Sequence, residues 1–85
     1  MKSSHTQINA LIEKIEKMLF SDYEQSGQLL EQLLDLSYKE NDPYGLYIAN
    51  NMLGILSSDM GQMDESMRYF SIAMSYMAFE ELKDE

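Results

Sequence analysis

The residues that could do acid–base or metal chemistry begin with one histidine near the start of the chain. His5 is the only histidine, and the chain contains no cysteine, which removes thiolate nucleophiles and Cys-based metal sites. A catalytic histidine needs an orienting partner within hydrogen-bond reach, and nothing in the spacing supplies one. We therefore expect His5 to be a solvated residue of a frayed N-terminus with no catalytic role.

A short acidic group is the second candidate for chemistry. Asp59, Asp64 and Glu65 flank a predicted turn and carry the oxygen ligands that a hard cation prefers. Their spacing is not that of an EF-hand loop, and acidic residues in the first turn of a helix are explained by the helix dipole. The sequence therefore predicts no metal site, no cofactor and no enzymatic activity.

Charge and composition narrow the possible partners. The 85 residues include 15 acidic and 6 basic ones, for a formal net charge of -9, and the basic residues are scattered. Because affinity for polyphosphate rests on grouped Lys and Arg, nucleic acid and anionic membranes are disfavoured as partners. No apolar run reaches the length of a membrane span or forms a secretion signal. We expect a soluble, cytoplasmic protein.

Apolar residues recur at helical spacing along almost the whole chain. The pattern predicts four helices, over residues 6–20, 21–38, 43–60 and 63–82. Short connections make successive helices antiparallel neighbours. The predicted fold class is therefore all-α: a single domain, residues 1–85, with two antiparallel helical hairpins (6–40 and 43–82) stacked as a short α-solenoid.

Local signals mark the expected helix ends. Ser21, with a glutamate three residues later, has the form of a capping box. Asp42 is a natural N-cap and Pro43 suits the first helical position, while Gly61 stands where a glycine in the left-handed conformation ends a helix. Gly27 lies inside the second predicted helix, where glycine costs roughly 1 kcal/mol, so we expect it to be a point of close packing between helices.

The two hairpins resemble each other and, in the second, a known repeat family. Ser26, Leu30 and Leu33 align with Ser66, Phe70 and Ala73, which indicates an internal repeat. The residues that define the second unit are Leu53, Gly54, Gly61, Phe70 and Ala73. Their spacing resembles that of the tetratricopeptide repeat (TPR), whose unit is about 34 residues. Residues 47–80 cover one such repeat, with departures at Asn50, Ser57, Ser66 and Ala78, where the family prefers Trp, Tyr, Ala and Pro.

The resemblance implies a protein or peptide partner in a concave groove lined by the first helix of each hairpin. Carried over from the family, the groove positions are Ile48, Asn51, Ile55, Ser58 and Asp59. The family's clamp for a terminal carboxylate uses Lys and Arg, which these positions lack. That class of ligand is therefore disfavoured.

The last predicted helix is apolar most of the way round, with one stripe rich in Met and a second rich in Tyr. A helix with a single neighbour needs an apolar stripe only slightly wider than about 100°, so we expect a further neighbour on its far side. Met and aromatic residues are also enriched at adaptable interfaces. The predicted self-association face comprises Tyr69, Ile72, Met74, Tyr76, Met77 and Phe79.

Three functional hypotheses follow, in order of preference. The first is a non-catalytic interaction and dimerisation module, a homodimer that forms the N-terminal regulatory part of a longer bacterial signalling protein; the repeat looks like those that precede diguanylate cyclase domains. The second is a free-standing adaptor or peptide-sensing regulator that binds a partner segment in the groove. The third, a small helical enzyme, is disfavoured because no nucleophile, base and orienting group come together.

Overall fold

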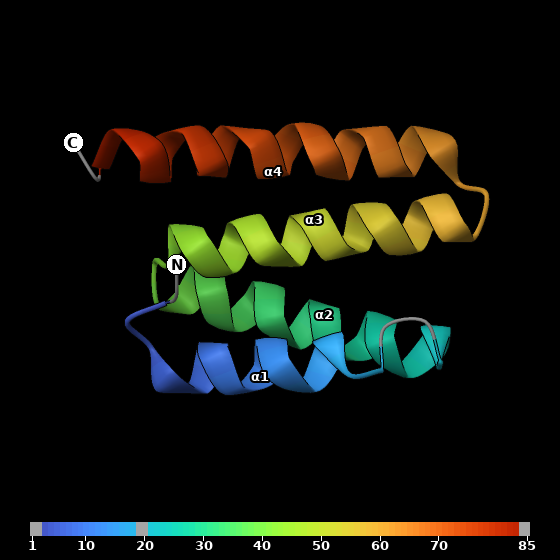
Figure 1. Cartoon of the computed structure of the whole chain (residues 1–85), viewed down its shortest axis with the longest axis horizontal. Coiled ribbons are helices and arrows are strands. Elements are labelled where there is room, and N and C mark those ends of the chain that lie inside the picture. The colour runs from blue at the N-terminus through green and yellow to red at the C-terminus, as the bar shows by residue number, and fades with distance from the viewer. Residues whose placement is uncertain (1–2, 19–20, 84–85) are drawn as a thin grey trace.

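The computed structural model describes residues 3–18 and 21–83, with side chains as far as residue 78. It contains four helices, α1 (Thr6–Glu16), α2 (Tyr23–Lys39), α3 (Pro43–Asp59) and α4 (Met63–Lys83). Figure 1 shows them stacked in chain order, each antiparallel to the one before, with α1 and α4 at opposite edges. The predicted all-α fold of two stacked helical hairpins is confirmed.

The core lies where α1, α2 and α3 meet. Its most deeply buried members, Ile8, Ile15, Leu30 and Leu33, are fully inaccessible to solvent, and α3 contributes buried residues on most sides. The α3 helix packs on α2 and also touches α1, whereas α4 packs along α3 and reaches α2 through the side chains of Tyr76 and Tyr38. The second hairpin therefore has a covered helix, α3, and an edge helix, α4.

The start of α2 corrects one sequence-based expectation. Ser21 does not cap this helix: its hydroxyl donates to the Met18 carbonyl at 3.0 Å. Asp22 is the N-cap, and its carboxylate accepts from the Gln25 N–H at 3.0 Å. A carboxylate satisfies the orphan amide and also complements the helix dipole, so it prevails over the serine next to it. The first helix also ends earlier than predicted, at Glu16; residues 19 and 20 lie outside the described residues.

The turns after α2 and α3 share one hydrogen-bond pattern. After α2, Asn41 adopts φ 50°, and the Asp42 N–H donates to the Ser37 carbonyl at 2.9 Å. After α3, Gly61 adopts φ 79°, and the Gln62 N–H donates to the Ser57 carbonyl at 2.8 Å. A left-handed residue just past the helix, followed by a donor to the carbonyl five residues back, is the Schellman arrangement. The prediction for Gly61 is confirmed, and the repeat extends to the turns.

The next helix begins as predicted, with Asp42 as N-cap and Pro43 in the first turn of α3. Two polar residues of α3, Asn50 and Ser57, face protein and not solvent. Asn50 is buried, and its side-chain amide donates to the Leu46 carbonyl at 2.8 Å; Ser57 is buried as well. The α3 helix lies between α2 and α4, which cover these two polar residues.

Candidate interaction surface

The contact between α3 and α4 is built around one glycine. A Cβ atom placed on Gly54 would lie 2.7 Å from the Phe70 ring, closer than non-bonded carbons approach. Two small residues of α4 add to this contact. The Ser66 hydroxyl donates to the Gly54 carbonyl at 2.8 Å, and Ala73 is almost fully buried. Gly54 thus leaves room for the large ring of Phe70 to lie directly on the α3 backbone.

The internal repeat is visible in the burial of equivalent residues. Ser26 and Leu33 of α2 are fully buried, and their counterparts Ser66 and Ala73 of α4 are each 2% exposed. The pair at the middle position differs: Leu30 is fully buried, whereas Phe70 is only half-buried. The side of α4 that faces its own hairpin is therefore as well buried as the equivalent side of α2. The greater exposure of α4 lies on another side of the helix.

That other side of α4 corresponds to the side of α2 that α3 covers. Gly27 follows Ser26 directly, and a Cβ atom placed on it would lie 4.0 Å from a methyl carbon of Leu56 in α3. The residue one position after Ser66 is Met67. Met67 of α4 is therefore equivalent to Gly27 of α2, and at that position α2 is covered by α3.

No helix of the described chain covers this place. Met63, Met67 and Met74 are 56%, 66% and 60% exposed, and at 100° per residue they share one side of α4. We call these three residues the Met face. An apolar cluster on one side of a helix, exposed where the equivalent helix is covered, is a candidate interaction surface.

The six residues of the predicted self-association face are divided by the structure. Ile72 and Met74 are exposed, whereas Met77 is half-buried; the Phe79 side chain lies outside the described residues. Tyr69 and Tyr76 point back into the molecule. Tyr69 packs against the core, and burial, together with the charge interaction and hydrogen bond with Tyr38 of α2, raises the pKa of Tyr76.

Met63 and Met67 belong to the Met-rich stripe of the last helix but are not among the six residues of the predicted self-association face. The signal that would have included them is the internal alignment. It places Met67 after Ser66 as Gly27 follows Ser26, and Gly27 belongs to the covered side of its helix. Periodicity alone shows two apolar stripes and does not say which one turns inward.

The predicted groove residues form a strip along α3. Ile48, Asn51 and Ile55 are half-buried, and Ser58 and Asp59 are exposed. The two isoleucines also pack against the core with one side. The strip is therefore accessible, but it contributes to the core as well.

The N-terminal segment is held in place, contrary to the expectation of a frayed end. His5 Nδ1 lies 2.9 Å from Asp42 Oδ2, and His5 Nε2 lies 3.5 Å from Glu40 Oε2. The Ser3 hydroxyl also donates to the Asp42 carboxylate, and Asn9 exchanges hydrogen bonds with the Ser3 backbone at 3.0 and 2.8 Å. Asp42 also accepts from the Gly45 N–H at 3.1 Å as the cap of α3. One carboxylate therefore joins the chain start to the turn between α2 and α3.

Burial alone would raise the pKa of Asp42, but the hydrogen bonds from Ser3, His5 and Gly45 outweigh it and hold that pKa below its usual value. Because an ionised carboxylate only accepts hydrogen bonds, His5 must donate from Nδ1. This contact could not be read from the sequence, because His5 and Asp42 are 37 residues apart along the chain.

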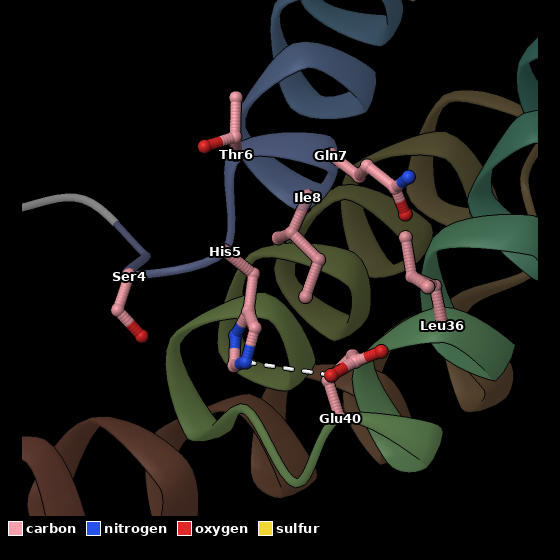
Figure 2. Close-up of a pocket in the computed structure, with 7 residues that line it drawn as sticks. All are labelled: Ser4, His5, Thr6, Gln7, Ile8, Leu36 and Glu40. Atoms are coloured by element: carbon pink, nitrogen blue, oxygen red, sulfur yellow. Dashed lines mark ion pairs between the residues drawn. The ribbon is translucent and has the colours of Figure 1, made fainter.

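Beside His5 lies an open pocket of about 270 Å³ between the start of α1 and the end of α2. Figure 2 shows the His5 ring turned toward Glu40, with Leu36 of α2 across from Gln7. The Ser3 hydroxyl and the imidazole both hydrogen-bond to the Asp42 carboxylate. These hydrogen bonds tie the segment from Ser3 to His5 to the turn between α2 and α3.

Within residues 3–18 and 21–83, no group of three or more His, Cys, Asp or Glu side chains is arranged to hold a metal ion. None of the helices in the same ranges is both long and apolar enough to cross a bilayer. Comparison of the chain with protein-family models, curated proteins and solved structures found no match. The class of protein is therefore defined by its fold, an all-α stack of helical hairpins.

Proposed function

We propose that this chain is a non-catalytic protein–protein interaction and dimerisation module of the helical-repeat type. The observation that supports the proposal is the Met face of α4, which is exposed at the place where α2 has α3 as a neighbour. Repeat proteins of this kind bury their apolar faces by adding neighbours, and a missing neighbour leaves such a surface open.

Charge favours this surface for contact between copies of the chain. Each copy carries a formal net charge of -9, so surfaces rich in acidic residues repel each other. The Met face carries no charge, and methionine adapts to irregular partner surfaces. Two copies can therefore meet here without bringing their carboxylates together.

The resemblance of residues 47–80 to the TPR family supports the same class of function. We propose that the module acts in the cytoplasm as the regulatory part of a longer bacterial signalling protein, in which pairing of the modules brings the attached domains together. The encoding reading frame beyond Glu85 tests this part directly, since a following catalytic domain is expected and an immediate stop codon would contradict it.

Association is tested by multi-angle light scattering over a concentration series. We expect dimers at micromolar concentration, because a contact along one helix pair lies at the small end of specific interfaces. Met74→Glu should shift the equilibrium to monomer with unchanged helix content, because this side chain is 60% exposed.

The matched control is Ser75→Glu, which adds the same charge at the next position, also exposed but turned by about 100° away from the Met face. The control should leave the dimer intact. A wild-type chain that is monomeric throughout the concentration series would refute the proposed function. Equal effects of the two substitutions would instead show that the dimer contact lies away from the Met face.

The second candidate is a peptide adaptor that binds a partner segment along Ile48, Asn51 and Ile55. The observation in its favour is that these residues form an accessible strip on a helix that is otherwise enclosed. Asn51→Ala would weaken such a peptide complex without changing the dimerisation of the module, which separates the two candidates.

A further inference from the structure

We infer that the Met face is covered by a second copy of this chain, whose α4 lies antiparallel to the first and places Met67 against Met74 of the partner subunit. The inference rests on the proposed dimerisation and specifies its geometry. Such a contact is isologous, so each copy contributes the same surface and the assembly closes as a dimer.

The direction follows from the packing inside the chain. On α2, the equivalent side is covered by α3, which runs antiparallel to it (Figure 1). A partner α4 in the same place and direction repeats a packing that the fold already contains. A parallel arrangement would instead set Asp64 and Glu65, in the first turn of α4, beside the same residues of the other copy. Like charges that face each other across an interface disfavour association.

The register follows from the spacing of the exposed methionines. Met67 and Met74 are seven residues apart, which is about 10.5 Å along the helix. A two-fold axis between Phe70 and Ser71 makes each of the two methionines face the other across the interface and sets Met63 opposite Ala78. All of these positions are uncharged. A shift that centres the axis on Met74 would instead bring Met67 level with position 81, which is a glutamate in the sequence.

The expected distances make this geometry measurable. Packed helices lie about 8–10 Å apart, and their Cα atoms lie about 2.3 Å from each axis, so directly facing Cα atoms are about 3.4–5.4 Å apart. This range overlaps the Cα separation that a disulfide requires, about 4.4–6.8 Å. Two Met67 Cα atoms would be about 12 Å apart in the same dimer, because the 10.5 Å offset along the axis adds to the lateral distance. A disulfide cannot span that separation.

The chain contains no cysteine, so every disulfide that forms must involve an introduced cysteine. We would prepare Met67→Cys and Met74→Cys with tags of different size and oxidise each alone and in an equimolar mixture. The mixture should give a disulfide-linked product with both tags, and neither variant alone should give one. Mixtures that contain Ser75→Cys in place of Met74→Cys should remain uncrosslinked. Circular dichroism confirms that each variant is folded before oxidation.

The other outcomes overturn the inference in distinguishable ways. Crosslinking of Met67→Cys alone indicates a parallel pairing or a shifted register, and dimers without any crosslink indicate a contact elsewhere on the chain; in both cases the proposed function stands. If the wild-type chain is monomeric at every concentration, the proposed function and the inference fail together.

Discussion

Replacing Gly54 with alanine tests whether the approach of Phe70 to the α3 backbone controls the second hairpin. The new methyl group would lie 2.7 Å from two ring carbons of Phe70, so the ring or α4 itself must move. Overpacking of this kind costs about 1–3 kcal/mol. Movement of α4 would also strain the 2.8 Å hydrogen bond from Ser66 to the Gly54 carbonyl.

The matched control is Gly27→Ala in α2, because both substitutions gain the roughly 1 kcal/mol by which alanine is preferred over glycine inside a helix. At Gly27 the nearest atom to the new methyl is a Leu56 methyl at 4.0 Å, an ordinary contact, so the gain is realised. Gly27 is therefore not the tight contact that the sequence suggested. The propensity gain cancels in the comparison, and Gly54→Ala should be less stable than Gly27→Ala by about 1–3 kcal/mol.

Thermal and urea denaturation followed by circular dichroism measure this difference. In a domain of this size, 1 kcal/mol corresponds to about 4–8 °C in Tm. Both variants are best compared at one protein concentration and in the Met74→Glu background, because dimerisation would stabilise the fold by mass action. Equal stabilisation by the two substitutions would refute the close approach of Phe70 to the α3 backbone and, with it, the account of how α4 is held.

Further predictions concern the chain start and a buried hydroxyl. Asp42→Asn keeps an oxygen that can cap α3 but loses the charge that binds Ser3 and His5, so we expect its free energy of unfolding to fall by about 1–3 kcal/mol at neutral pH. The loss should exceed that of the control Asp22→Asn, whose cap has no contact with the N-terminal segment. Urea denaturation measures both. Because the folded-state pKa of Asp42 lies below its ordinary 3.8, the ionised carboxylate stabilises the fold above that pH and this contribution disappears as the pH falls through the lowered pKa. The wild type should thus lose its advantage over Asp42→Asn in acid, and a constant difference across the pH series would contradict the assignment. Ser37 is fully buried, and its hydroxyl has no hydrogen-bond partner among the described residues, so Ser37→Ala should be neutral or raise the free energy of unfolding by about 1 kcal/mol; a clear loss in the same assay would show that the hydroxyl is satisfied.

The sequence by itself determined the helices, their order and most of their ends. Apolar spacing, the Asp42 and Pro43 signal and Gly61 are local features, and local features are sufficient for helices joined by short turns. The sequence also placed Gly54, Phe70 and Ala73 at the spacing of a helical hairpin, but the contact of Gly54 with Phe70 is seen only in the structure.

The tertiary structure decided which of two apolar stripes on α4 turns inward. Tyr69 and Tyr76 face the molecule and leave Met67 and Met74 exposed, a distinction that depends on where α3 lies and that periodicity cannot supply. The structure also shows where the segment from Ser3 to His5 is held. The hydrogen bonds from Ser3 and His5 to the carboxylate at position 42 join residues that only the folded chain brings together. Local sequence thus fixes the elements, while the sides that they bury depend on neighbours distant in the chain.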